Sequence, residues 1–230
     1  MIRLPTPAIA RIHAHICGDG SFYKKREKRS PGTLLKHKRR NIYRTEHILE
    51  YYNLSRELLD EFKMDFKIAF NRNIQTNRNK IQVRGAKRIA EDLQLIGKNS
   101  YTWYIPFFIS ESSKTVIGSW IRAFFDDEAY VDPTRDRILV KCMNKNGLEQ
   151  VVTLLQKLHI NSKITGPNCD KSYYLVVKKD GLNMYHDQIG FTMHRKKEAL
   201  NKIIEKLVGN GATGTFRKED CSSHQFESRI

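Results

Sequence analysis

The stretch IHAHICGDG occupies residues 12–20, and the stretch IRAFFDDEA occupies residues 121–129. Each is mostly apolar, is compatible with a helix, and ends in an acidic residue beside a small one: Asp19 in the first stretch and Glu128 in the second. A carboxylate at the carboxyl end of a helix faces the negative end of the helix dipole, which costs about 0.3–1 kcal/mol at an exposed position. A turn or a solvated helix end explains one such acid. Two at matched positions favour a shared function, because a bound cation would offset the cost.

The same series of expected elements follows each stretch, so the sequence contains an internal repeat. The first half predicts strands at residues 21–28, 34–52 and 80–84, helices at residues 55–70 and 86–95, and a further strand after the first of these helices. The second half predicts strands at residues 130–132, 137–143, 159–164 and 173–178, helices at residues 148–158 and 181–188, and a last helix at residues 194–207. We therefore expect an α+β fold of two pseudo-symmetric αββαββα half-domains, residues 1–100 and 101–208, with a flexible tail at residues 209–230.

The composition predicts a polyanionic partner. The 230 residues contain 41 Lys and Arg against 25 Asp and Glu, a formal net charge of +16. Nucleic acid is the first candidate for a basic chain of this kind. An anionic membrane surface is the second, but the sequence has no long apolar run and its first ten residues do not form a signal peptide. We expect an intracellular protein that is not secreted.

The cysteines and the common catalytic motifs exclude several functions. None of the four cysteines, Cys17, Cys142, Cys169 and Cys221, lies in a C-x-x-C pair, which argues against a zinc site and against a disulfide framework. The eight histidines are scattered, and the spacing of His13 and His15 does not suit a shared metal ion. The sequence also lacks a P-loop, a G-x-S-x-G motif and an H-E-x-x-H motif.

A basic segment follows the first stretch. Residues 21–44 contain ten Lys and Arg residues and one acid. A two-stranded ribbon fits the major groove of DNA, and alternation along each strand means that only part of these side chains can read bases while others contact phosphates. A smaller set of basic residues occupies the matching position in the second half. The predicted DNA-binding residues are Lys24, Arg26, Lys28, Lys36, Lys38, Arg40 and Arg44 in the first half and Arg135, Arg137 and Lys141 in the second.

The two stretches resemble the paired LAGLIDADG motifs of single-chain homing endonucleases. The resemblance, which includes the order of the elements after each motif, covers about residues 9–191. It implies that the two motif helices pack against each other between the half-domains and bring Asp19 and Glu128 together at the base of a DNA-binding saddle. Three features depart from the family pattern: Ala129 replaces a glycine, His13 and His15 replace aliphatic residues, and Asp127 replaces a small residue.

The resemblance also implies the chemistry of the site. Asp19 and Glu128 would bind two or more Mg²⁺ ions, for which Mn²⁺ substitutes, with help from the backbone carbonyls of Gly18 and Asp127. Asn53 and Asn144, each expected after the second strand of its half, would contact metal-bound water. Lys178, or its neighbour Lys179, would place a positive charge near the reacting phosphate. The chain would then be a monomeric endonuclease that hydrolyses both strands of a long, non-palindromic double-stranded DNA target.

Other functions compete with this interpretation. A maturase that binds intron RNA would keep the basic saddle without needing both acids. A DNA-binding protein of the same fold that does not cleave is a second alternative, although such regulators normally add a helix-turn-helix domain that the sequence does not show. A basic structural or ribosome-associated protein would explain the charge but not the repeated acidic helix ends. Among the endonucleases, we expect a free-standing or intron-encoded type.

Overall fold

The computed structural model describes residues 5–28, 42–95 and 101–212. The predicted DNA contacts Lys36, Lys38 and Arg40 lie outside the described residues, as do the turn expected near residue 31 and most of the predicted tail. Within the described part of the chain, no helix is both long and apolar enough to cross a membrane.

The first half contains the predicted αββαββα series. Helix α1 begins after Thr6, whose hydroxyl accepts a hydrogen bond from the backbone N–H of Ile9, and Pro7 occupies its first turn. Helix α3 begins after Ser55 as predicted, but the Ser55 hydroxyl makes no capping hydrogen bond. The elements are α1 (Pro7–Cys17), β1 (Gly20–Lys28), β2 (Tyr43–Tyr52), α3 (Arg56–Phe70), β3 (Thr76–Asn77), β4 (Lys80–Arg84) and α4 (Lys87–Asp92).

The second half repeats this series after a short helix that the sequence did not predict, α5 (Phe107–Ser110). Ser113 caps the second motif helix through a hydrogen bond from the backbone N–H of Val116. The helix that was expected at residues 148–158 begins three residues earlier, at Lys145, and this difference affects the site. The elements are α6 (Lys114–Glu128), β5 (Ala129–Asp132), β6 (Arg137–Cys142), α7 (Lys145–Lys157), β7 (Ser162–Thr165), β8 (Tyr173–Val177), α8 (Lys179–Gln188) and α9 (His194–Ala212).

The two halves have sheets of the same topology. The first sheet has the strand order β1-β2-β4-β3 and the second has the order β5-β6-β8-β7, and all paired strands are antiparallel. In each sheet, alternate residues point toward a hydrophobic core and the others point to an open face. The first core includes Leu49, Tyr51, Ile81 and Val83. The predicted fold of two pseudo-symmetric αββαββα units is therefore confirmed.

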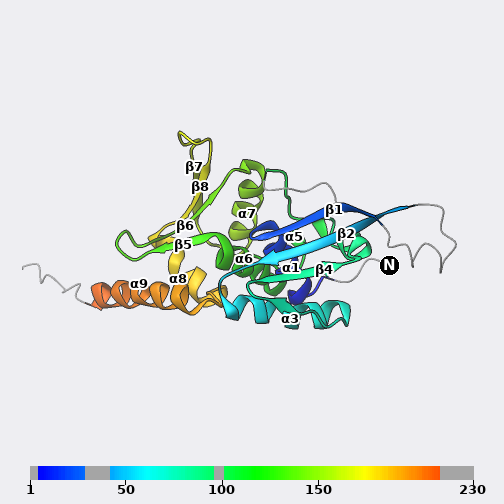
Figure 1. Cartoon of the computed structure of the whole chain (residues 1–230). Helices are drawn as coiled ribbons and strands as arrows, with labels where there is room; N and C mark the ends of the chain where they lie inside the picture. The colour runs from blue at the N-terminus through cyan, green and yellow to red at the C-terminus, as the bar shows by residue number, and fades with distance from the viewer. Residues whose placement is uncertain (1–4, 29–41, 96–100, 213–230) are drawn as a thin grey trace, which may run out of the picture.

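Helices α1 and α6 pack against each other between the two sheets (Figure 1). Small residues at positions 10, 14 and 18 follow one face of α1, and Ala10 and Ala14 belong to the same buried cluster as Trp120 and Ala123 of α6. Because every fourth residue of a helix returns to the same face, these small side chains let the two backbones approach closely. The sequence motifs therefore form the interface between the halves, as the resemblance implied.

The two motif histidines bridge this interface instead of facing a metal. His13 is fully buried, and its Nδ1 accepts a hydrogen bond of 3.0 Å from the indole Nε1 of Trp120 on α6. His15 is also fully buried, and its Nδ1 lies 2.9 Å from Oδ2 of Asp127 on α6. Buried polar groups need such partners because an unmade hydrogen bond in the interior costs about 1–3 kcal/mol. The histidines thus replace aliphatic packing with polar contacts that fix how the two helices meet.

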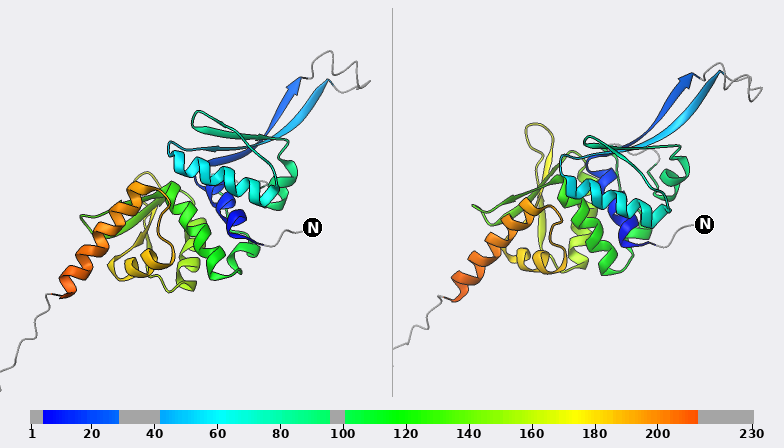
Figure 2. Two further views of the ribbon diagram at one scale, coloured as in Figure 1. Left: turned by 90° about the horizontal axis from the view of Figure 1, so that it is seen from below. Right: turned by 60° about the horizontal axis from the view of Figure 1, so that its bottom comes forward.

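Helix α9 begins beside the N-terminal part of α3 and then runs along the second half (Figure 2). At its start, the backbone N–H of His194 donates to Oε2 of Glu57 over 3.0 Å, and the Thr192 hydroxyl donates to Oε2 of Glu61 over 3.3 Å. Its apolar face packs into the second core through Leu200 and Ile203. The segment after the repeat is therefore attached to both halves at the level of α3 and α6.

Candidate functional site

Asp19 and Glu128 lie where the two motif helices end. Asp19 follows Gly18, the cap of α1, and Glu128 is the last residue of α6. The ends of these helices touch, because a side chain added at Gly18 would place its Cβ 2.9 Å from both Cβ and Oδ2 of Asp127. Asp19 is also close enough for its charge to raise the pKa of Glu128. The structure therefore brings together the two acids that the sequence singled out.

The carboxylate of Asp127 is the centre of a buried hydrogen-bond network. Its side chain is fully buried, and it accepts hydrogen bonds from the hydroxyl of Tyr51 at 2.8 Å and from Nδ2 of Asn53 at 3.1 Å, in addition to its contact with His15. Several donors stabilise a carboxylate that burial would otherwise penalise. The residue that replaces a small one in the motif is thus held by three side chains from the other half. The sequence predicted only a role for its backbone carbonyl.

Asn53 joins this network to Asp19. It lies directly after β2 and is 6% exposed. Its Nδ2 donates to Oδ2 of Asp19 over 2.9 Å, and its Oδ1 accepts from the backbone N–H of Ser55 over 2.8 Å. Because the backbone N–H of Ser55 can only donate, this bond fixes Oδ1 toward Ser55 and leaves Nδ2 to donate to Asp19. The structure thus places Asn53 against Asp19, and its contact with metal-bound water stays a prediction.

The matching prediction for Asn144 was wrong. Asn144 is the cap of α7: its Oδ1 accepts from the backbone N–H of Gly147 over 3.0 Å, and its Nδ2 donates to the backbone carbonyl of Trp103 over 2.6 Å. It is 4% exposed, so both ends of the amide are used inside the protein. The reason is the early start of α7, which places this residue at a helix terminus that needs an acceptor for its free N–H groups.

Burial and mutual repulsion raise the pKa of both motif acids. Burial is the largest cause for each; the charge of Asp127 adds to it at Asp19, and the charges of Asp19 and Asp127 add to it at Glu128. Lys196, His15 and the hydrogen bond from Asn53 offset part of this effect at Asp19. The pKa is about 6 for Asp19 and about 7 for Glu128, against ordinary values of 3.8 and 4.5.

This pair of acids fits a hard divalent cation. Two neighbouring carboxylates with raised pKa values are neutralised by a bound cation, and oxygen ligands suit Mg²⁺ and Mn²⁺. In residues 5–28, 42–95 and 101–212, no three His, Cys, Asp or Glu side chains come together as a metal-binding group. The acidic ligands would therefore be Asp19 and Glu128 alone, with backbone carbonyls and water completing the shell. Mg²⁺ tolerates such a sparse protein shell because it keeps several waters.

A lysine that the sequence did not single out lies beneath this centre. Lys196, in the first turn of α9, is 7% exposed, and its Nζ reaches the backbone carbonyls at the end of α6. Burial lowers its pKa, and the charges of Asp126, Asp127 and Asp19 oppose that change. Nothing in the local sequence distinguishes Lys196 from its basic neighbours Arg195 and Lys197, because its burial comes entirely from the packing of α9.

The open face of the second sheet carries a basic groove of about 890 Å³. Glu128 is among the residues that line it, so the groove extends to the acidic pair. Two tyrosines, Tyr130 and Tyr174, and the apolar side chains of Leu139 and Val176 form part of its floor. The predicted residues Arg135, Arg137, Lys141 and Lys178 all line it, together with Lys179 and with Lys163, which we had not predicted.

The charges in this groove include one close pair of like sign. Lys178 lowers the pKa of Lys163 through a side-chain contact and through its charge. Lys141 pairs with Asp170 over 2.6 Å, and Arg137 pairs with Asp132 over 3.1 Å. An anion placed at the two lysines would relieve their repulsion, whereas a phosphate at Lys141 would compete with an existing partner.

The open face of the first sheet is different, because its cations are paired with acids. Arg44 and Arg84 both contact Glu27 and Glu46, at distances of 3.0–3.7 Å. Glu50 accepts hydrogen bonds from Tyr23, Lys80 and Gln82, the last of these at 2.5 Å. A surface that presents amides, acids and arginines together offers both donors and acceptors to base edges.

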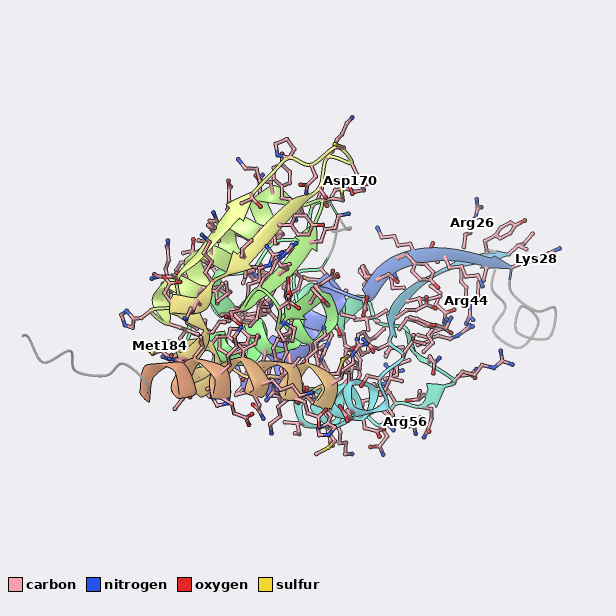
Figure 3. The ribbon with its side chains drawn as sticks, turned by 90° about the vertical axis from the view of Figure 1, so that its left-hand side faces the viewer. Arg26, Lys28, Arg44, Arg56, Asp170 and Met184 are labelled. Carbon is pink, nitrogen blue, oxygen red and sulfur yellow. The ribbon has the colours of Figure 1, made fainter. Side chains whose placement is uncertain are left out.

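The basic residues of β1 divide between the two faces of the hairpin, and the three predicted ones share a single face. Lys24, Arg26 and Lys28 alternate with Lys25 along the strand and share the face of Phe22, which packs against the first core. Arg26 also stacks over the ring of Tyr43, with 4.3 Å from Cζ to the ring centroid. Figure 3 shows Arg26, Lys28 and Arg44 on the far part of the hairpin, with Asp170 at the tip of the second sheet. Lys25, which we had not predicted, contacts Glu27 on the open face.

Comparison with known proteins agrees with this architecture. The family model of the LAGLIDADG-like domain matches residues 115–190. The solved structure of I-DmoI in complex with DNA and Mn superposes with a TM-score of 0.56, covering 80% of this chain and 96% of that chain at 17% identity. Full-length DUF199/WhiA from Thermatoga maritima superposes with a TM-score of 0.55, covering 87% of this chain and 60% of that chain at 12% identity.

The curated relatives are much longer proteins, of which this chain spans less than a fifth. A probable translation initiation factor IF-2 of Methanocaldococcus jannaschii is 34% identical over 116 residues, which cover 47% of this chain and 10% of that protein. A glutamine--fructose-6-phosphate aminotransferase of the same organism is 25% identical over 223 residues, 90% of this chain and 18% of that protein. Because the chain spans so small a part of these relatives, their names say nothing about its own activity.

Two sheets of identical topology, joined through a pair of motif helices that end in acids, define a LAGLIDADG fold. The second half matches the family model over the motif helix and both hairpins. Residues 115–190 are thus a LAGLIDADG-like domain by the family model, and the chain as a whole has the two-domain LAGLIDADG fold seen in I-DmoI.

Proposed function

We propose that this protein is a site-specific endonuclease that hydrolyses both strands of a long, non-palindromic double-stranded DNA with divalent metal ions. The observation that carries the proposal is the meeting of Asp19 and Glu128 at the ends of two packed helices, beside the basic groove of the second sheet. A bound divalent metal would polarise the scissile phosphate and activate water for hydrolysis.

The side chains of this protein would supply positioning and charge. Asp19 and Glu128 would hold the metal, and Asn53 would keep one oxygen of Asp19 fixed through its hydrogen bond. The Lys163 and Lys178 pair in the groove would bind backbone phosphates near Glu128. The open face of the first sheet would read base edges with its arginines, amides and acids. These differences between the sheets support a target whose two half-sites differ in sequence.

The first test is cleavage of a DNA pool by the purified protein in Mg²⁺ and in EDTA. The pool should include the junction formed when the DNA on either side of the reading frame is joined, together with randomised sequences. We expect cutting of a defined sequence in Mg²⁺ and none in EDTA. Asp19→Asn and Glu128→Gln should abolish cutting and leave binding within a few-fold of wild type. Asp187→Asn changes an exposed acid of α8 and should cut normally.

A nucleic-acid-binding protein that does not cleave is the second candidate. The fold likeness to WhiA supports it, because the likeness extends beyond structures that are described as endonucleases. Such a protein would bind DNA or intron RNA on the basic faces and would show no cleavage with any divalent metal. Retained cutting by the Asp19→Asn, Glu128→Gln double variant would reject our assignment of the site, and tight binding without any cutting would support the second candidate.

A further inference from the structure

The end of α6 and the start of α9 cap each other. The Asp126 carboxylate accepts hydrogen bonds from the backbone N–H groups of Thr192 at 2.9 Å and Met193 at 3.0 Å, directly before α9. In the opposite direction, Nζ of Lys196 donates to the carbonyls of Phe125 at 3.0 Å and Asp126 at 2.5 Å and lies 3.5 Å from that of Asp127. Both partners are buried, since Asp126 is 0% and Lys196 is 7% exposed.

This arrangement solves a problem at the end of the second motif helix. The last four carbonyls of a helix have no partner within it, and α6 ends in three consecutive acids at the negative end of its dipole. The residue that follows α6 supplies one capping N–H, from Ala129 to the carbonyl of Phe125. The Lys196 ammonium group supplies donors and a positive charge at the same place. Without it, the Asp126 carbonyl would lose the donor that Lys196 supplies, and the Phe125 carbonyl would keep the N–H of Ala129.

We propose that Lys196 is a positioning residue of the metal centre: by closing the carbonyl end of α6, it fixes the position from which Glu128 and the Asp127 carbonyl reach the metal. This inference rests on the proposed function and extends it to α9, which lies beyond the region that matches the family model. Lys196 also lowers the pKa of Asp19 and Glu128, which agrees with its place beneath both acids.

The test compares Lys196→Met with two control variants of the same helix. Lys197→Met removes an exposed neighbouring lysine, so it controls for loss of charge from α9. Ile203→Ala removes a 1% exposed core contact of α9 and leaves the carbonyls of α6 capped, so it controls for loss of stability. The free proteins are titrated with Mn²⁺ in a calorimeter, and cleavage is then measured on the selected target at a temperature where all variants are folded.

A positioning role predicts that Lys196→Met binds Mn²⁺ more weakly than wild type. Loss of the ammonium group should weaken Mn²⁺ binding at least ten-fold and cleavage at least a hundred-fold, while both controls stay within three-fold of wild type. A lysine that merely compensates charge would act oppositely, because its removal makes the acidic pair more attractive to a cation. Unchanged or tighter Mn²⁺ binding by Lys196→Met, or an equal loss in Ile203→Ala, would therefore overturn the proposal.

A second variant covers the case in which Lys196→Met does not fold. Lys196→Gln keeps an N–H donor that reaches toward the carbonyls and removes the charge, so it should fold and show an intermediate loss of Mn²⁺ affinity. Wild-type affinity in this variant would also reject the role of the ammonium group. The calorimetric result does not depend on cleavage. If wild type binds Mn²⁺ but cuts no DNA, the proposed function fails while the role of Lys196 is still decided; if wild type binds no Mn²⁺, both fail.

Discussion

Replacing Glu128 by Gln should stabilise the metal-free protein while it abolishes cleavage. The pKa of this carboxyl is raised from 4.5 to about 7, first by burial and then by the charges of Asp19 and Asp127. A raised pKa in a folded protein means that the neutral form is favoured. The stability that the group contributes is therefore fully present below pH 4.5 and is lost as the pH rises through about 7. Gln resembles the neutral form at every pH.

The difference between the ordinary pKa of Glu128, 4.5, and its value in the folded protein, about 7, sets the size of the stability gain. One pKa unit corresponds to 1.36 kcal/mol, so the ionised side chain costs about 3 kcal/mol at pH 8. Solvent reaches this half-buried group and screens part of the repulsion, which leaves an expected gain of about 1–3 kcal/mol for Glu128→Gln. At pH 5 the folded-state side chain is almost fully protonated while the unfolded-state one is mostly ionised, so the gain should fall to about a quarter of its value at pH 8.

Urea unfolding in EDTA at pH 5 and pH 8 measures this gain directly. Glu149→Gln is the matched control, because Glu149 is exposed on α7, where it pairs with Lys145 at the surface. Added Mg²⁺ should stabilise wild type at pH 8 and leave Glu128→Gln unchanged, since the cation relieves the repulsion that the substitution removes. A variant less stable than wild type at pH 8, or an equal gain at both pH values, would refute the electrostatic account.

Three further predictions concern packing, hydrogen bonding and charge. Gly18→Ala should lower the free energy of unfolding by about 1–3 kcal/mol, because its Cβ would meet Asp127 at 2.9 Å. Gly209→Ala in helix α9 meets nothing within 4 Å and should not destabilise the protein in the same urea assay. Asn53→Ala should reduce the cleavage rate at least ten-fold with binding intact; Asn144→Ala should instead cost about 1 kcal/mol of stability as a lost helix cap and leave the rate per folded molecule unchanged. DNA binding should weaken by at least two orders of magnitude between 50 and 200 mM salt in a filter assay, and a flat response would contradict phosphate contacts by the basic groove.

The sequence was sufficient for features that depend on local pattern. Alternation along the strands and the apolar motif helices predicted the repeated αββαββα order, and the matched acids predicted that Asp19 and Glu128 meet. Ala129 replaces the glycine of the motif, which would strain the backbone if φ were positive there. Its φ is −83°, a conformation open to any residue, so the replacement causes no strain. Position 20 requires a glycine for steric reasons, because a Cβ at Gly20 would lie 2.5 Å from Cα of Ile16.

Asn53 and Asn144 mark the limit of that reasoning. Each follows the second strand of its half, and the repeat predicted equal roles. Their roles differ because two residues, Leu54 and Ser55, separate Asn53 from the start of α3, whereas α7 begins directly after Asn144. A difference of two residues in a helix start decides whether an amide caps a helix or faces the acids, and helix boundaries are the least certain part of a sequence pattern.

What the sequence determined by itself, then, was the repeated order of elements and the pair of acids, because hydrophobic periodicity and motif spacing depend on neighbours along the chain. Tertiary structure alone decided the buried network around Asp127, the division of basic residues between two sheet faces, and the burial of Lys196 beneath the acids. Those features depend on which side chains from distant segments meet out of water. Asp127 is buried against His15, more than a hundred residues away in the sequence, and Lys196 is buried against Phe125, about seventy residues away.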